Sequence, residues 1–301
     1  MERPAGTARH VVACGLATLD VVQTVDRLPA PDEKVVARGL WVAAGGPAAN
    51  AAVTAAGLGV RATLVSRVGD GTVARVVLDD LHAHDVEVLD LAPEGASPAV
   101  STVLVTASTG ERAVVSVNAT TPRSLTDVTT SAEAWEDAVA SAGAVLVDGH
   151  HLDLALGVAA AARSAGVPVL LDGGSWKPGL ERLLAVTDVA LLSADFRLPG
   201  ASGTPAALLR AVRGLGPAHV ARSQGSGPVQ LLVDDDVVEV AVPAVDVVDT
   251  LGAGDVLHGA LAAWLAVHGP PAVLGDLRAG LTYAAHVASS SCTGQGARGW
   301  L

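Results

Sequence analysis

The stretch of sequence that decides the fold is Val247-Val248-Asp249-Thr250-Leu251-Gly252-Ala253-Gly254-Asp255-Val256-Leu257-His258-Gly259-Ala260, and an Ala- and Leu-rich run of helical character continues it to Val267. Its small residues Gly252, Ala253 and Gly254 let backbone amides crowd around an anion where larger side chains would collide. The same amides stand at the start of a helix, where unpaired N–H groups and the positive end of the dipole favour phosphate. The stretch therefore predicts an anion-binding turn that opens a helix.

Asp255 lies in the first turn of this predicted helix, and its position allows two interpretations. An acidic residue in a first turn stabilises a helix by about 0.3–1 kcal/mol and needs no further role. Alternatively, the carboxylate is a general base that accepts the proton of a hydroxyl group bound beside the anion.

Short apolar runs alternate with Ala-rich stretches of helical length, which predicts an α/β fold. The helical stretches cover residues 48–58, 154–165 and 205–214, and the apolar runs cover 10–15, 62–66, 144–147, 168–172, 189–193 and 219–221. Strands that alternate with helices form βαβ units, so we expect a parallel-rich central sheet sandwiched by helices, a Rossmann-like arrangement.

Two segments, 21–43 and 98–119, break this rhythm. The first contains Leu28-Pro29-Ala30-Pro31-Asp32 followed by alternating residues, and the second is a hairpin around Ser108-Thr109-Gly110-Glu111. Together they predict a small β-sheet inserted into the α/β core as a lid; the alternative is a decorative edge of the main sheet. The free edges of such lid strands are a candidate interface for a homodimer.

The composition limits the classes of partner. The chain has 301 residues and a net charge of −12, whereas a nucleic-acid-binding face must be basic. Two cysteines, Cys14 and Cys292, make no metal motif or disulfide framework, so we expect reduced thiols. The first residues make a poor signal peptide, and no window approaches the roughly 18–20 apolar residues of a membrane helix. We expect a soluble, cytoplasmic protein without nucleic-acid or membrane partners.

Two motifs carry a resemblance to a known family. The run from Asp249 to Asp255 resembles the C-terminal signature of the ribokinase-like (phosphofructokinase-B, PfkB) carbohydrate kinases, and Gly45-Gly46-Pro47-Ala48-Ala49-Asn50-Ala51-Ala52 resembles their N-terminal signature. The two lie in the family's order, about two hundred residues apart. The likeness covers essentially the whole chain, which implies one kinase domain over 1–301 with the lid segments inserted. Val248 to Gly254, with Cys292-Thr293-Gly294-Gln295-Gly296, is most similar to the ketohexokinase/fructokinase branch.

The resemblance implies ATP-dependent phosphorylation of a sugar or polyol hydroxyl with Mg²⁺, and many family members respond to a monovalent cation such as K⁺. It implies that Asp255 is the base. The anion hole would be Gly252, Ala253 and Gly254, and the sugar hydroxyls would be held by Asp20, Gly45, Gly46 and Asn50. Nucleotide contacts would come from Ser223, Gly225, Gly227, Val248, Gly252 and Gly254. Arg112, on the predicted lid hairpin, is either a contact for a substrate anion or an exposed charge.

Two of the places where the chain departs from the family pattern bear on the metal and on the acceptor. Ser193-Ala194-Asp195-Phe196 replaces the Asn-x-x-Glu motif that organises magnesium, so Asp195 is either an indirect partner of the metal or a surface acid. Pro47 stands where ketohexokinases carry a sugar-binding Asn, and it offers no side-chain hydrogen bond. The second departure weakens the case for a ketohexose and leaves a polyol acceptor open.

Two other functions stay open beside the sugar kinase. A nucleoside kinase of the same family usually holds its base between aromatic or large apolar groups, and this chain has only seven aromatic residues. A non-catalytic sugar-binding protein on the same fold would be expected to lose Asp255 and the anion hole. We expect His258 and His268 to be ordinary helix residues, and Lys177 is a weaker candidate for a phosphate contact.

Overall fold

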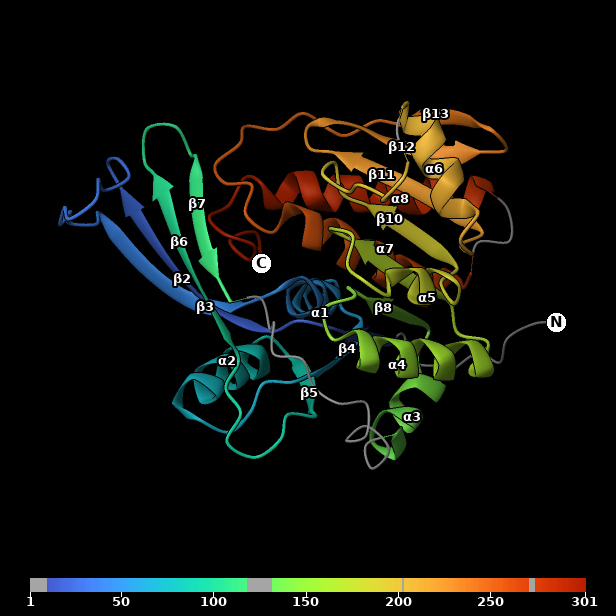
Figure 1. Ribbon diagram of the computed structural model, residues 1–301, viewed down its shortest axis with the longest axis horizontal. Helices are drawn as coiled ribbons and strands as arrows, with labels where there is room; N and C mark the ends of the chain where they lie inside the picture. The colour runs from blue at the N-terminus through green and yellow to red at the C-terminus, as the bar shows by residue number, and fades with distance from the viewer. Residues whose placement is uncertain (1–9, 118–131, 202, 271–273) are drawn as a thin grey trace.

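The computed structural model describes residues 10–117, 132–201, 203–270 and 274–301, and a nine-stranded sheet forms its centre (Figure 1). The strand order is β13-β12-β11-β10-β9-β8-β1-β4-β5, and only β12 and β13 run antiparallel to their neighbours. The strands are β1 (His10–Cys14), β4 (Arg61–Ser66), β5 (Val86–Asp90), β8 (Ala144–Val147), β9 (Val169–Gly173), β10 (Val189–Leu192), β11 (His219–Gln224), β12 (Gly227–Val233) and β13 (Asp236–Val240). The predicted parallel-rich sheet is confirmed.

Helices cover both faces of this sheet, as predicted (Figure 1). One face packs against α1 (Pro47–Gly57), α2 (Thr72–Ala83), α7 (Ala253–His268) and α8 (Leu274–Ser291). The other packs against α3 (Ala132–Ala140), α4 (Leu152–Ala165), α5 (Leu180–Leu184) and α6 (Pro205–Arg213). Small residues allow close packing: a Cβ on Gly259 of α7 would lie 2.5 Å from the Ala51 oxygen of α1. This approach places the first turn of α7 beside α1.

A separate four-stranded sheet, called here the small sheet, has the order β3-β2-β6-β7 and stands out from the α/β body (Figure 1). It comprises β2 (Thr18–Val25), β3 (Gly39–Gly45), β6 (Ala99–Thr106) and β7 (Arg112–Ser116), with β2 and β6 parallel and the other pairs antiparallel. The predicted small sheet is confirmed, and the alternative of an edge of the main sheet is wrong. Its first strand starts at Thr18, earlier than predicted, and residues 118–119 of the predicted segment lie outside the described residues.

The order of the central strands determines where a ligand can bind. The chain passes from β1 to β4 and β5 on one side, and β8 to β13 continue on the other. In open α/β sheets the crevice at such a switch, at the carboxyl ends of the strands, is the usual ligand site. Across the described ranges, no helix is long and apolar enough to cross a membrane.

Candidate active site

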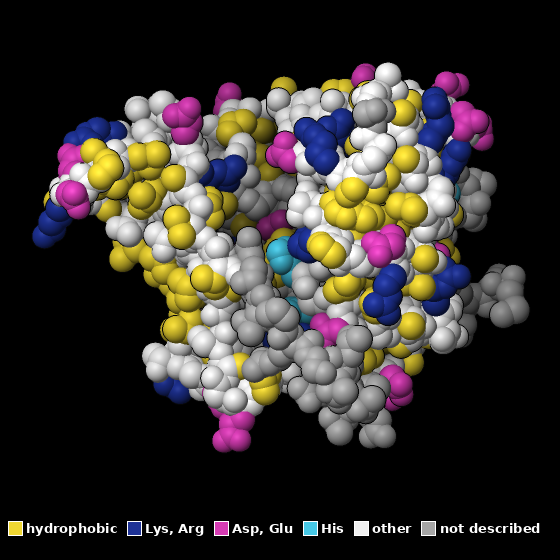
Figure 2. Space-filling model, in the orientation of Figure 1, with side chains coloured by type: hydrophobic (Ala, Val, Ile, Leu, Met, Phe, Trp, Pro, Cys, Tyr) yellow, Lys and Arg dark blue, Asp and Glu magenta, His cyan; other side chains and the backbone are white. Residues whose placement is uncertain are grey.

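A cavity of about 540 Å³ lies at this switch point, between the small sheet, the ends of β1 and β8, the start of α7 and the C-terminal segment. Figure 2 shows the hollow between the small sheet and the larger body, with histidine side chains visible in it. Its volume is within the range of small-molecule sites. It is lined by Leu16, Thr18, Asp20, Trp41, Ala43, Ala44, Gly46, Pro47, Asn50, Asp80, His84, Ser101, Val114, Ser116, His150, Leu251, Gly252, Asp255, Gln295, Gly296, Ala297 and Arg298.

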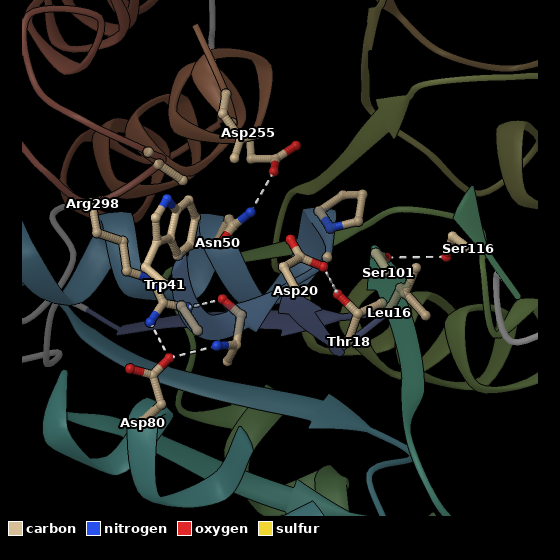
Figure 3. A pocket seen from close by; sticks show the side chains of 18 of the residues that line it. Leu16, Thr18, Asp20, Trp41, Asn50, Asp80, Ser101, Ser116, Asp255 and Arg298 are labelled. Carbon is tan, nitrogen blue, oxygen red and sulfur yellow. Dashed lines mark hydrogen bonds and ion pairs between the residues drawn. The ribbon is translucent and has the colours of Figure 1, made fainter. Parts of the chain in front are cut away.

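Asp255 reaches the cavity from the first turn of α7. Its Oδ2 accepts a hydrogen bond from Nδ2 of Asn50 on α1 at 2.7 Å (Figure 3). The pKa of Asp255 is raised to about 7: burial and the negative charge of Asp172 raise it, while the bond from Asn50 and the charge of His258 lower it. A carboxylate that titrates near neutrality in a cavity has the properties of a general base.

The turn before Asp255 has the geometry of an anion site. Gly252 is the N-cap of α7 and has a φ of 74°, a left-handed conformation that glycine adopts without strain. Ala253 donates its amide to the Thr250 carbonyl at 3.3 Å. In the described part of the chain, neither Gly254 nor Asp255 donates its amide to a protein acceptor. A Cβ on Gly254 would have no atom within 4 Å, and this glycine is exposed, so the turn is open to a ligand on that side.

Gly45 and Gly46 have no room for side chains. A Cβ on Gly45 would overlap the carboxylate of Asp20, and one on Gly46 would lie 2.5 Å from the Leu16 oxygen. Gly46 also has a φ of 97° and precedes Pro47, which begins α1. The pair therefore lets β3 end directly against β2 and turns α1 so that Asn50 faces the cavity.

Asp20 belongs to a polar row that crosses the small sheet. Its neighbours in the register are Ala43 on β3 and Ser101 on β6, and Ser101 pairs in turn with Ser116 on β7. Thr18 donates its hydroxyl to Asp20 at 2.7 Å, and the hydroxyls of Ser101 and Ser116 lie 3.1 Å apart (Figure 3). Burial raises the pKa of Asp20, and bonds from Thr18 and Ser101 oppose this shift. The row presents hydroxyl and carboxylate groups that suit a polyhydroxylated ligand.

The sequence interpretation missed an ion pair that closes the other side of the cavity. Arg298, near the C-terminus, contacts the carboxylate of Asp80 on α2 and donates to the Ala44 carbonyl. Asp80 also accepts the Ala44 amide at 2.7 Å. Trp41 lies beside Arg298 in Figure 3 and is the only Trp, Tyr or Phe among the described lining residues. No sequence motif marks these residues, because they come from three separate segments: β3, α2 and the C-terminal segment.

Asp148 was also missed, and it holds three segments of the site together. Its carboxylate accepts backbone amides from Leu16 at 2.8 Å, His150 at 2.8 Å and Ala48 at 3.2 Å, and the side chain is almost fully buried. Gly15 is required here because a Cβ would overlap this carboxylate. Hydrogen bonds from several backbone N–H groups can stabilise a buried carboxylate without the help of a cation.

His258 differs from the expected ordinary helix residue, whereas His268 is exposed, with Nδ1 2.9 Å from the Trp264 oxygen and its ring stacked on that of Trp264 one turn earlier. The His258 ring is buried, with Nδ1 2.7 Å from the Gly254 oxygen and Nε2 2.9 Å from the Leu191 oxygen. Oδ2 of Asp172, at the end of β9, lies 3.4 Å from Nδ1. The ring therefore connects the start of α7 to the central sheet.

The remaining predicted residues lie outside the cavity lining. Arg112 is exposed on β7 and donates to the Thr250 hydroxyl at 3.3 Å, across from the turn before α7. Asp195 is exposed in the loop after β10. The predicted nucleotide contacts are placed as follows: Ser223 at the end of β11, Gly225 in the two-residue turn between β11 and β12, Gly227 at the start of β12, and Val248 exposed before α7.

A family model describing pfkB family carbohydrate kinases matches residues 8–300. This chain belongs to the pfkB family. It is 26% identical over 298 residues to a ribokinase from Bacillus subtilis, covering 97% of this chain and 96% of that one. It is 29% identical over 301 residues to an ATP-dependent ribose-1-phosphate kinase from Halopiger xanaduensis, covering 96% and 94%. A solved ribokinase from Arabidopsis thaliana, in complex with ribose and ATP, superposes with a TM-score of 0.74 at 24% identity, over 96% of this chain and 94% of that one.

These comparisons confirm the predicted fold and the predicted class, a carbohydrate kinase. The relatives just described are named for ribose or ribose 1-phosphate, not for a ketohexose. The family is therefore shown, while the predicted ketohexokinase/fructokinase branch remains a prediction.

Proposed function

We propose that this protein transfers the γ-phosphoryl group of ATP to a hydroxyl group of a sugar or polyol, with Asp255 as the general base. The observation that carries the proposal is the position of the Asp255 carboxylate in the cavity wall. It lies beside the amides of Gly254 and Asp255, which have no protein acceptor among the described residues. A hydroxyl bound next to an anion at this point can lose its proton to the carboxylate while its oxygen attacks phosphorus.

The proposed step transfers one proton and exchanges one P–O bond. The acceptor oxygen forms a bond to the γ-phosphorus, the bond from that phosphorus to the β–γ bridging oxygen breaks, and ADP leaves. The hydroxyl proton goes to Asp255, which Asn50 holds by its 2.7 Å bond. Phosphoryl transfer needs mainly positioning and stabilisation of charge, and amides at the start of a helix supply both without covalent chemistry.

The acceptor is proposed to lie against the polar row, with Asp20 and Asn50 as hydroxyl contacts and the bare backbone of Gly45 and Gly46 beneath it. The names of the relatives support ribose as the first acceptor to test, and the resemblance in the turn before α7 supports a ketohexose or related polyol. With Trp41 as its one large ring, the cavity offers little to sandwich a base, which disfavours the nucleoside alternative.

ATP is proposed to reach the anion turn Gly252–Gly254 from the side of Ser223, Gly225, Gly227 and Val248. Magnesium in kinases is usually held by substrate phosphates, one or two carboxylates and waters. No group of three metal-ligating side chains occurs in the described ranges, and the exposed Asp195 is free to act through water, so the residues fit a Mg²⁺ ion that arrives with ATP. A monovalent cation such as K⁺ remains part of the proposal through the family resemblance.

The chain is proposed to act as one kinase domain over residues 1–301, with the small sheet as the lid of its acceptor site. Apolar side chains on this sheet are exposed, including Leu40 at 64% and Val115 at 74%. The outer strands β3 and β7 each pair on one side only within the described residues. These features support the predicted homodimer through the small sheet, which sedimentation velocity would detect.

A coupled ADP-release assay tests the proposed function. The panel comprises ribose, ribose 1-phosphate, fructose, other ketoses and aldoses, sugar alcohols and nucleosides, each with ATP and Mg²⁺. We expect release that depends on one sugar or polyol class and yields the phosphorylated acceptor by mass spectrometry. Stimulation by nucleosides alone would favour the nucleoside alternative, and no stimulation by any acceptor would contradict the proposal.

A further inference from the structure

The His258 ring contacts two backbone carbonyl groups, one on its own helix and one on the central sheet. A neutral imidazole has one donor nitrogen and one acceptor nitrogen. Here both nitrogens lie within 3 Å of backbone carbonyl oxygens, Nδ1 near Gly254 and Nε2 near Leu191, and a carbonyl oxygen can only accept. A neutral ring would therefore press one lone pair against a carbonyl oxygen in the protein interior. Only the doubly protonated ring donates to both.

Acidic side chains lie around the ring. Asp172 lies 3.4 Å from Nδ1, and the side chains of His258 and Asp172 are only 4% and 8% exposed. Asp255 stands one turn earlier on α7, and Asp148 lies at the end of β8. His150 and Lys177 are the other titratable groups that act on Asp172. Buried charges need partners of opposite sign, and three carboxylates here face few cations.

We propose that His258 is a positioning residue for phosphoryl transfer, which ties the Gly254 carbonyl to the central sheet as a protonated ring paired with Asp172. Because a peptide unit is planar and trans, its carbonyl and its N–H point in opposite directions. Fixing the Gly254 oxygen on the side of His258 therefore directs the Asp255 N–H away from the ring, toward the open end of α7. This inference rests on the proposed function, in which that amide receives the phosphoryl group.

The ring also acts on the base. The Asp172 carboxylate raises the pKa of Asp255, and the positive charge of His258 opposes this effect. Without the charge of His258, nothing on this ring would oppose the effect of the Asp172 carboxylate on Asp255. The pKa of Asp255 would then rise further, and a smaller fraction of the enzyme would carry the ionised carboxylate at neutral pH.

The test uses three variants of the full chain. His258→Leu removes both bonds and the charge, His258→Gln keeps a donor without the charge, and His268→Leu changes an exposed histidine of the same helix as a control. We expect His258→Leu to lower kcat about tenfold or more at pH 7, with little change in acceptor KM. The acid limb of its pH–rate profile, where activity falls as Asp255 becomes protonated, should move upward by about one pH unit. The kcat of His258→Gln should lie between those of His258→Leu and the wild type, with its acid limb still shifted. His268→Leu should match the wild type in both respects.

A folded His258→Leu variant with a normal kcat and an unmoved acid limb would overturn the proposal. NMR of the wild-type ring gives an independent test, which stands even if the leucine variant does not fold or the acceptor is not found. Both ring nitrogens of His258 should carry protons in long-range ¹H–¹⁵N spectra of the folded protein. A ring with a single N–H at pH 7 would refute the protonated tether and leave the proposed kinase activity untouched.

Discussion

The small sheet and the first turn of α7 face each other across one cavity and are built in different ways. The small sheet offers side chains on successive strands, such as Asp20 on β2 and Ser101 on β6, in a row that pairs between strands. The first turn of α7 offers backbone amides beside Asp255, with the buried side chains of His258 and Asp172 behind it. Side chains in a row can be exchanged one at a time without moving the backbone, whereas the turn needs a glycine at Gly252, where φ is 74° and a Cβ would lie 2.4 Å from the Cβ of Ala297. This difference suggests that the sheet selects the acceptor and the turn performs the transfer.

A side chain that blocks the turn should lower kcat more than any change to the small sheet. Gly254→Val places a branched side chain in space that holds no protein atom within 4 Å, so the fold should tolerate it. If phosphate occupies that space, kcat should fall by about 10²–10³, the usual cost of losing one donor to the transition state. Affinity for ATP should also weaken.

The matched control is Gly71→Val, since a Cβ on Gly71 likewise meets no atom within 4 Å and this glycine caps α2 away from the cavity. Steady-state kinetics and isothermal titration with a non-hydrolysable ATP analogue give the two readouts. If the two valine variants have the same kcat and the same affinity for ATP, the proposed position of the phosphate beside Gly254 is wrong.

Changing the sheet should affect the acceptor alone. Asp20→Ala removes a carboxylate from the polar row, and losing a hydrogen bond to a charged group costs about 1.5–3 kcal/mol, which corresponds to a rise of roughly ten- to a hundredfold in acceptor KM. The KM for ATP should change little, because Asp20 lies on the opposite wall from the turn. A variant whose ATP KM rises as much as its acceptor KM would break the proposed division between the two regions.

The pH dependence should come from the turn and not from the sheet. With a pKa of about 7, Asp255 is half protonated at neutrality, and only its ionised form accepts a proton. The kcat/KM of the wild type should therefore fall about tenfold for each unit below pH 7 and level off above pH 8. A profile that stays flat from pH 5 to 8, measured at constant ionic strength, would show that no group of this kind limits the reaction.

The smallest effect concerns stability. Because the folded protein raises the pKa of Asp255 above the ordinary value near 3.9, the native state binds more protons than the unfolded state between about pH 4 and 7. This group therefore disfavours folding increasingly as pH rises through that window. The melting temperature of Asp255→Asn should therefore rise relative to that of the wild type as the pH is raised from 5 to 8. A relative loss would support the interpretation of Asp255 as a stabilising first-turn acid.

The sequence predicted the start of α7 well because the pattern that opens this helix depends on neighbouring residues. Gly252, Gly254 and Asp255 must lie within one turn of the chain for backbone amides and one carboxylate to share a helix start, so the pattern is visible in a single stretch. The βαβ rhythm and the small sheet were readable for the same reason, since strand and turn patterns are local.

The rest of the cavity could not be read in this way. Arg298, Asp80 and Trp41 meet only after the C-terminal segment folds against α2 and β3, and nothing in their sequence neighbourhoods indicates the contact. Asp148 resembled the end of any buried strand until the structure showed three amides converging on it. The burial of His258 depends on β9 and β10, more than sixty residues away in the chain.

The central claim is that Asp255 takes the proton of the acceptor hydroxyl, and the most direct measurement is the kcat of Asp255→Asn at saturating ATP and acceptor. The amide keeps the size of the side chain and lacks the basic carboxylate. Asp79→Asn, an exposed acid on α2, serves as the matched control. We expect kcat of Asp255→Asn to fall by about 10²–10⁴ with nearly unchanged nucleotide affinity, while the control matches the wild type. A kcat within a few-fold of the wild type for Asp255→Asn would contradict the claim.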